Sequence, residues 1–154
     1  MAKNYKTIVL EDNFQACRDA LTGEMLMDAA MAGGFVVEAH AKINAGSGRP
    51  GLQIQTGHLV NSIQTTKGKK SPKQAWARVG TNAVYARIHE LGGLIIPLNF
   101  SKLSWVNDQG QRIFAGAVHI PARPYLRPAM DENEKDIVGA VEAEIQRNLD
   151  KATK

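Results

Sequence analysis

The histidines are the side chains of this chain best suited to bind a metal or to transfer protons. His89 and Glu90 begin an HExxH pattern, but Gly93 stands where the second histidine would have to be, so the zinc-binding pair is incomplete. The other three histidines share no spacing that puts two of them on one helical turn. A metal site assembled from distant positions is the alternative to ordinary hydrogen-bonded histidines. We predict no metal site.

Three glycines, Gly46, Gly48 and Gly51, have the GxGxxG spacing of a pyrophosphate-binding loop. That loop works between a strand and a helix, with an acidic residue about 20 positions further on. Here the preceding segment has a helical pattern, Pro50 interrupts the motif, and the next acidic residue is Glu90. We therefore interpret residues 44–55 as a flexible linker and expect no nucleotide cofactor, or any other.

Nucleophilic catalysis has little support in the sequence. There is no GxSxG motif, and the single cysteine, Cys17, lies on the apolar stripe of a predicted helix, where packing is the usual role. The acidic residues lie mainly on predicted outer helices, which are normally solvated, so no pair of carboxylates with shifted pKa values is expected. We expect no catalytic residue and no enzyme. A small metal-dependent hydrolase or nuclease is the alternative, and its activity would disappear on chelation.

Charge is segregated along the 154 residues, although the net charge is only +4. Residues 39–89 carry eight basic side chains and no acidic one, whereas residues 131–150 carry seven acidic and two basic side chains. Such asymmetry indicates a polyanionic partner for the middle segment, or copies of the chain meeting basic face to acidic face. An uneven solvated surface is the simpler alternative. No apolar run is long enough for a membrane span, and early acidic residues disfavour a signal peptide, so we expect synthesis in the cytoplasm and no membrane partner.

The sequence KGKKSPK concentrates the positive charge of the middle segment. The basic residues that could contact DNA or an acidic partner are Lys67, Lys69, Lys70, Lys73 and Arg78. On a hairpin tip they could touch phosphates without reading bases, or serve only to keep an edge soluble. Trp76 could stack on a base, or pack across the strands. A DNA-binding accessory protein is therefore one functional hypothesis.

Periodicity predicts an α+β fold. A capping box at Asp12 and Gln15 begins a long helix to about Ile43, with a kink at Gly33 and Gly34. Thr56 is placed to cap a short helical turn, and antiparallel strands follow from about residue 62 and over 74–81. A short helix over 84–91 ends at two glycines.

The second half of the chain has weaker patterns. Short strands are predicted within residues 94–118, with NDQG as a turn, and an amphipathic helix from Pro128 to about Asp150, with Asp131, Glu132 and Glu134 at its N-terminus. We therefore expect one domain over residues 1–154, with an N-terminal arm at 1–11 and an inserted region at 94–118. Its long N-terminal and C-terminal helices would pack on a mostly antiparallel β-sheet, with a short helix between strands.

A stiff segment precedes the last helix. Residues 119–130 contain three prolines, each of which fixes its own φ and favours an extended residue before it. A preordered segment loses less entropy on docking, which suits an assembly surface. Arg123 and Arg127 could then pair with acidic residues of a neighbour. Alternatively, the prolines only position the last helix within the same chain.

Three blocks of sequence, in order, carry a family resemblance: TGHLVNSI, ARVGTNAVYARIHELGG and IPARPYLRPAMDENEKDIVGAVEAEI. Together they resemble the head-to-tail joining proteins of tailed bacteriophages, called tail-completion, neck or virion-morphogenesis proteins. The family typically passes quickly from the second block to the third. Residues 94–118 intervene here, which is more similar to the virion-morphogenesis branch.

The resemblance implies a non-enzymatic structural subunit of the virion, made in the host cytoplasm and assembled as a ring at the neck. Its implied partners are other copies of itself, neighbouring head-connector and tail-terminator or tail-tube proteins, and non-specifically the passing DNA. The matching positions are Thr56, Gly57, Leu59, Ser62, Val79, Gly80, Thr81, Tyr85, Gly92, Pro121, Ala122, Arg123, Pro124, Leu126, Pro128 and Ala129.

Physical roles can be assigned to some of these positions. Gly57, Gly80 and Gly92 would allow turns or close approach. Three apolar residues would anchor the core: Leu59, Val79 and Leu126. The predicted assembly interface consists of Pro121, Arg123, Pro124, Tyr125, Arg127 and Pro128.

Overall fold

The computed structural model describes residues 23–48, 52, 56–71 and 74–152. Its elements are α2 (Gly23–Ile43), a π-helical turn (Asn44–Gly48), α3 (His58–Ser62), β1 (Gln64–Ser71), β2 (Gln74–Gly80), α4 (Ala86–Leu91), β3 (Gly93–Ile95), β4 (Leu103–Val106), β5 (Arg112–Ala115), β6 (Val118–Ile120), α5 (Leu126–Asp131) and α6 (Glu134–Ala152). This is the predicted α+β class. Within the described residues, no helix is both long and apolar enough to cross a membrane.

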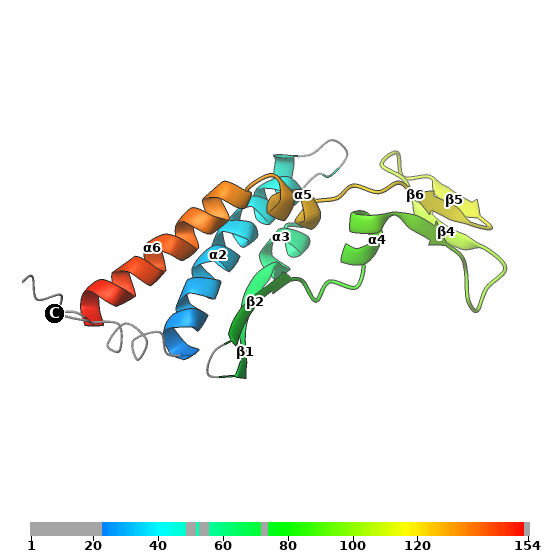
Figure 1. Ribbon diagram of the computed structural model, residues 1–154. Helices are drawn as coiled ribbons and strands as arrows, with labels where there is room; N and C mark the ends of the chain where they lie inside the picture. Colours follow the sequence, from blue (N-terminus) through cyan, green and yellow to red (C-terminus); the bar gives the residue numbers. More distant parts are fainter. Residues whose placement is uncertain (1–22, 49–51, 53–55, 72–73, 153–154) are drawn as a thin grey trace, which may run out of the picture.

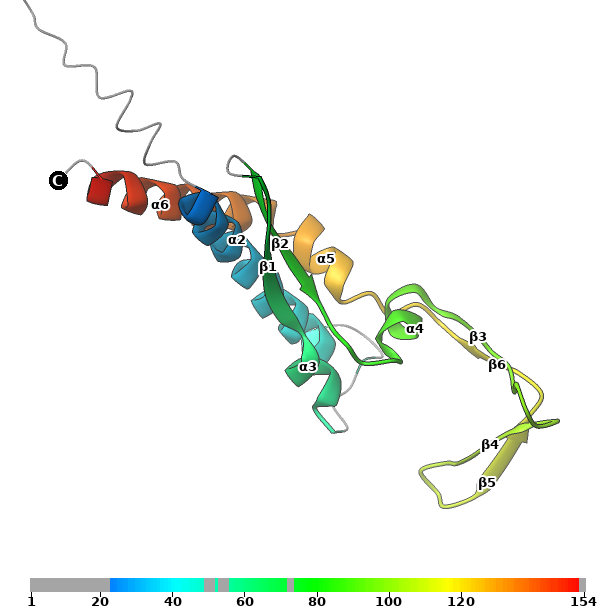
Figure 2. The ribbon, with the colours of Figure 1, turned by 90° about the horizontal axis from the view of Figure 1, so that it is seen from below.

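Helix α2 is the centre of the body of the molecule, with the β1–β2 hairpin on one side and α6 on the other (Figures 1 and 2). The predicted kink is wrong, because α2 runs through both glycines as one helix. A Cβ on Gly33 would lie 2.9 Å from Val141 Cγ2 of α6, and one on Gly34 would lie 2.6 Å from Thr65 Cγ2 of β1. The two glycines therefore let α2 approach both neighbours closely.

The β1–β2 hairpin is antiparallel, with partners running from Gln64 and Gly80 to Ser71 and Gln74. Its predicted alternation is confirmed, since Trp76 and Arg78 are exposed whereas the residues between and beside them are half-buried. A Cβ on Gly68 would collide with the ring of its cross-strand partner Trp76, so the indole packs over the Gly68 backbone. The predicted hairpin tip was too long: β1 continues to Ser71, so Lys67, Lys69 and Lys70 lie on a strand.

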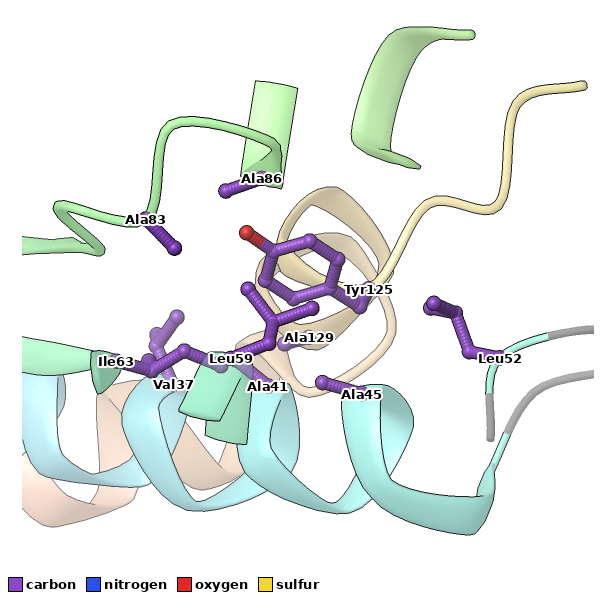
Figure 3. Packing of buried hydrophobic residues seen from close by; sticks show 10 residues of the cluster. All are labelled: Val37, Ala41, Ala45, Leu52, Leu59, Ile63, Ala83, Ala86, Tyr125 and Ala129. Atoms are coloured by element: carbon purple, nitrogen blue, oxygen red, sulfur yellow. The ribbon is translucent and has the colours of Figure 1, made fainter. Parts of the chain in front are cut away.

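A small core brings together residues of α2, α3, α4 and α5 and of the segments beside them. It consists of Val37, Ala41, Ala45, Leu52, Leu59, Ile63, Ala83, Ala86, Tyr125 and Ala129. Figure 3 shows the Tyr125 ring in the middle of this cluster. Val79 and Leu126 pack against it as partly buried residues, and Leu59 is buried within it, so all three predicted anchors are confirmed.

The predicted single C-terminal helix is wrong. The chain forms α5 and then α6, separated by Glu132 and Asn133. The Asn133 side chain donates a hydrogen bond to the Ala129 carbonyl at 3.0 Å, which satisfies a carbonyl at the end of α5 and favours a break. Asp131 therefore ends α5, and the acidic residues of the first turn of α6 are Glu134 and Asp136.

The predicted linker is partly helical, because Asn44–Gly48 continues α2 as a π-helical turn with Ala45 and Gly46 buried. Leu52 is also buried in the core. The rest of that linker, the N-terminal arm at 1–11, the capping box at Asp12 and Gln15, and Cys17 lie outside the described residues.

Residues 93–120 form a narrow extension that we call the ribbon. In it β3 pairs with β6 and β4 pairs with β5, both antiparallel, so the predicted short strands are confirmed. They do not join the β1–β2 hairpin in one sheet; the described strands form three two-stranded sheets. Both views show the ribbon extending away from the body (Figures 1 and 2).

Candidate assembly surface

Glu90 holds the end of the proline segment. Its carboxylate, on α4, accepts hydrogen bonds from the backbone N–H groups of Tyr125 at 2.8 Å, Leu126 at 3.0 Å and Arg127 at 2.9 Å. These are unpaired donors at the start of α5, where a negative charge is also favoured by the helix dipole. Glu90 was missed as a site residue, because a cap supplied from a distant helix has no local sequence signal.

Two further contacts hold the same segment against α4. The Arg123 N–H donates to the His89 carbonyl at 2.7 Å. Gly92 has φ +70°, and a Cβ there would lie 2.7 Å from the Ala122 nitrogen, so only glycine permits this approach. The HELGG and PARPYLRP motifs therefore form one rigid unit, which supports the interpretation that the prolines position the last helices within the same chain.

The predicted interface residues do not all lie at the surface. Pro121, Pro124 and Arg127 are exposed, and the residues that remain half-buried are Arg123 and Pro128. Tyr125 is wrong as a surface residue, because it is only 2% exposed and fills the core. Burial, and secondarily the negative charge of Glu90, raise the pKa of Tyr125 to about 12.

The two arginines of this segment already have neighbours in the chain. Arg127 Nε lies 3.4 Å from Asp131 Oδ2, and both side chains are exposed, so the ion pair contributes little to stability. Arg123 lies close enough to His89 to affect its titration. Burial and then the Arg123 charge lower the pKa of His89, which favours the neutral imidazole.

The first two motif blocks also meet. The Ser62 and Thr81 hydroxyls are 2.5 Å apart, and Ser62 also donates to the Leu59 carbonyl at 2.8 Å. The Tyr85 hydroxyl lies 3.1 Å from His58 Nδ1. The matching residues of TGHLVNSI and VGTNAVYA thus connect α3 to the segment after β2.

The structure confirms some of the predicted roles of the remaining motif positions and contradicts others. Gly57 has φ +70° and precedes α3, so its predicted turn is confirmed. Gly80 has neither a positive φ nor a close neighbour, so its predicted role is wrong. Thr56 Oγ1 accepts only a long, 3.4 Å hydrogen bond from the His58 N–H, and the N-cap residue is Gly57.

Two buried side-chain nitrogens of the described residues, His89 Nδ1 and Asn148 Nδ2, make no hydrogen bond, and that of His89 lies next to the proline segment. Across the described part of the chain, no three His, Cys, Asp or Glu side chains are grouped so that they could hold a metal ion.

One basic residue of the β1–β2 hairpin, Arg78, lies over an aromatic ring. Lys67 and Arg78 are exposed, and the Arg78 guanidinium lies 5.0 Å from the centre of the Trp76 ring. That distance is in the range of a cation–π contact. Lys69 and Lys70 lie on β1, and Lys73 falls outside the described residues.

The ribbon carries the largest group of exposed apolar side chains among the described residues. They are Leu94, Ile95, Ile96, Leu98, Phe100, Trp105, Val106 and Phe114. Leu98 is 90% exposed and Phe100 is 81% exposed. Large groups of exposed apolar side chains are uncommon on soluble monomers and often mark interaction sites. The sequence predicted strands here but not this surface, because periodicity does not reveal whether a two-stranded ribbon has a body to pack on.

A second apolar feature lies on the body. A groove of about 450 Å³ lies beside α2 and is also lined by residues of β2, α4, α5 and α6. Its apolar lining includes Ala30, Gly33, Val37, Val79, Ile137 and Val141. We call this feature the α2 groove.

Comparison with known protein families gives a match over most of the chain. Residues 37–146, which run from the second half of α2 through most of α6, match the phage virion morphogenesis family. No curated protein and no solved structure matches the chain.

Proposed function

Since this chain belongs to the phage virion morphogenesis family, and thus to virion assembly, we propose that it is a non-enzymatic structural subunit of the phage neck. In this proposal, copies of the chain form a ring that completes the tail or joins it to the DNA-filled head. Its partners are other copies of itself and the neighbouring head-connector, tail-terminator or tail-tube proteins.

The uncovered apolar surface of the ribbon is the observation that carries the proposal. The family match includes the ribbon, so this surface belongs to the matched region and is not an addition outside it. Isolated two-stranded ribbons are marginally stable in water, and burying exposed leucine and phenylalanine side chains is strongly favourable. A subunit with neighbours on both sides provides that burial, which a monomer does not.

Charge and rigidity support the same proposal. Exposed Lys67 and Arg78 lie on the hairpin, while seven acidic residues lie between positions 131 and 150, so neighbouring copies can meet with opposite charges. The proline segment, fixed by Glu90, presents Pro121, Pro124 and Arg127 without a large entropy cost on docking. Head-to-tail contacts of this kind generate a closed ring when the rotation between copies permits it.

Light scattering tests the proposal. We expect the purified protein to have the mass of a ring, or to be a monomer that joins purified tails or DNA-filled heads. The charge-reversal variant Arg127→Glu should weaken that association, whereas Lys151→Glu on the last turn of α6 provides a matched control. A monomer that ignores both particles would refute the neck assignment.

The stacked Trp76 and Arg78 favour a second candidate function, a DNA-binding accessory protein. An exposed indole next to a guanidinium is a platform for a base, and exposed Lys67 can contact a phosphate. Binding of a single-stranded oligonucleotide, measured by fluorescence anisotropy, should then weaken steeply with salt and be reduced by Trp76→Ala. Tight binding by a chain that joins neither heads nor tails would favour this candidate over the ring.

A further inference from the structure

We propose that the ribbon of one subunit docks in the α2 groove of the next copy, with Leu98 and Phe100 as its principal anchors. This inference rests on the proposed ring, and it specifies which two surfaces meet. It therefore adds the ribbon and the α2 groove to the interface predicted at the proline segment.

The ribbon has the properties of an inserted element. Leu98 and Phe100 lie in the loop between β3 and β4, and they are the most exposed leucine and phenylalanine of the described chain. The strands of the ribbon pair with one another, and the ribbon extends away from the body in both views (Figures 1 and 2). Its apolar side chains are therefore presented to a second molecule.

The α2 groove has the properties of an acceptor. Its volume of about 450 Å³ is within the range of about 300–1,000 Å³ that is typical of sites holding a bound group. Gly33 and Gly34 contribute only backbone atoms to its lining, at the point where α2 packs closely against α6 and β1. Met130 lines the groove and is 59% exposed, which places an apolar side chain at an accessible edge.

Charge complementarity favours a second copy as the occupant. The ribbon carries Lys102 and Arg112 against a single acidic residue, Asp108. The groove is bordered by α5 and α6, which together carry six acidic and four basic residues, and the charged residues of its own lining are Glu90 and Arg127. The ribbon, with a net charge of +1 from these three residues, therefore meets a pair of helices with a net charge of −2, and the opposite signs favour this pairing.

The two surfaces are different parts of the molecule, so their contact is head-to-tail. An isologous dimer would use one patch on both partners, whereas a ribbon in a groove leaves a free groove on one subunit and a free ribbon on the other. Each added copy then offers the same pair of surfaces, and a closed ring buries them all.

Chemical cross-linking between two singly substituted chains tests this contact. In a Cys17→Ser background, one chain carries Phe100→Cys and the other carries Met130→Cys. A short bis-maleimide should give a covalent dimer in the mixture, and little in either chain alone. The reaction is run on the purified chain and on particles assembled with it. A third chain, Val84→Cys, is the control, because Val84 is 96% exposed and lies outside both surfaces.

The outcomes separate this inference from the proposed function. Assembly into rings or onto particles without the mixed cross-link would overturn the ribbon-to-groove contact and leave the neck role intact. Cross-linking of Phe100→Cys with itself would show ribbon-to-ribbon pairing, which also overturns it. Failure to assemble or to join any particle would instead contradict the proposed function.

Polar variants give a second, independent measurement. Leu98→Ser with Phe100→Ser should weaken self-association by about tenfold or more for each side chain, because the buried apolar surface is lost. The circular dichroism spectrum should be unchanged, since these side chains are exposed in the single chain. Val84→Ser should leave association unchanged. Normal association of the double variant would refute the role of these anchors.

Discussion

Replacing Glu90 should destabilise the protein far more than replacing another acidic residue. In Glu90→Ala, the N–H groups of Tyr125, Leu126 and Arg127 lose their acceptor. A hydrogen bond to a charged group contributes about 1.5–3 kcal/mol. Two of the three donors are in partly buried contacts and the third is exposed, so water replaces part of the interaction. We expect a loss of about 2–4 kcal/mol.

Thermal unfolding followed by circular dichroism measures this loss. For a chain of this length, 1 kcal/mol corresponds to a change in Tm of about 2–4 °C, so Glu90→Ala should lower Tm by about 5–15 °C. Glu142→Ala is the matched control, because Glu142 is exposed on α6, and such surface changes are usually within about 0.5 kcal/mol.

Hydrogen exchange identifies the cause of any loss. The amides of residues 125–127 should exchange faster in Glu90→Ala, while those in the middle of α6 should change only in proportion to global stability. Equal Tm values for Glu90→Ala and Glu142→Ala would show that the carboxylate does not hold the proline segment. A large loss of Tm without faster exchange at residues 125–127 would refute the capping role.

Further expectations concern packing, titration and association. Gly34→Ala should lower the free energy of unfolding by about 1–3 kcal/mol, since its Cβ would lie 2.6 Å from Thr65 Cγ2. Gly139→Ala on α6 should raise it by about 0.5–1 kcal/mol, because a Cβ there meets nothing within 4 Å. Unfolding in denaturant measures both changes. The pKa of Tyr125 is raised to about 12 from its ordinary value of 10, so the neutral phenol stabilises the folded state below pH 10. This contribution to the free energy of unfolding should be lost between about pH 10 and 12, and Tyr125→Phe should remove that pH dependence. Tm should also rise with protein concentration if copies bury the ribbon, which differential scanning calorimetry measures, and a constant Tm would contradict burial.

The elements that depend on local pattern were predictable from the sequence. Alternation correctly assigned the faces of β2, with Trp76 and Arg78 exposed. The glycine after the HEL turn ended α4 at Gly92, with φ +70°. Both follow from the conformational preferences of a few neighbouring residues, so no information from distant parts of the chain was needed.

Features that depend on distant contacts were not predictable. Gly33 and Gly34 were interpreted as a kink, because the sequence does not show that β1 and α6 approach the same helix from two sides. Tyr125 was placed on the surface because it lies among exposed prolines, yet Leu59 and Ala86 in other elements surround it in the core. The break between α5 and α6 depends on one side-chain hydrogen bond from Asn133, which competes with a periodic apolar pattern.

The distribution of apolar residues connects the fold to its proposed assembly. Half of the ten residues in the core cluster are alanines, which bury little apolar surface each, whereas Leu98, Phe100 and Phe114 are exposed on the ribbon. Hydrophobic free energy scales with the apolar area removed from water, so the single chain gains none from the exposed parts of these ribbon side chains. In the proposed assembly, association with neighbouring copies would bury these side chains, while the close packing around α2 and Glu90 stabilises the single chain.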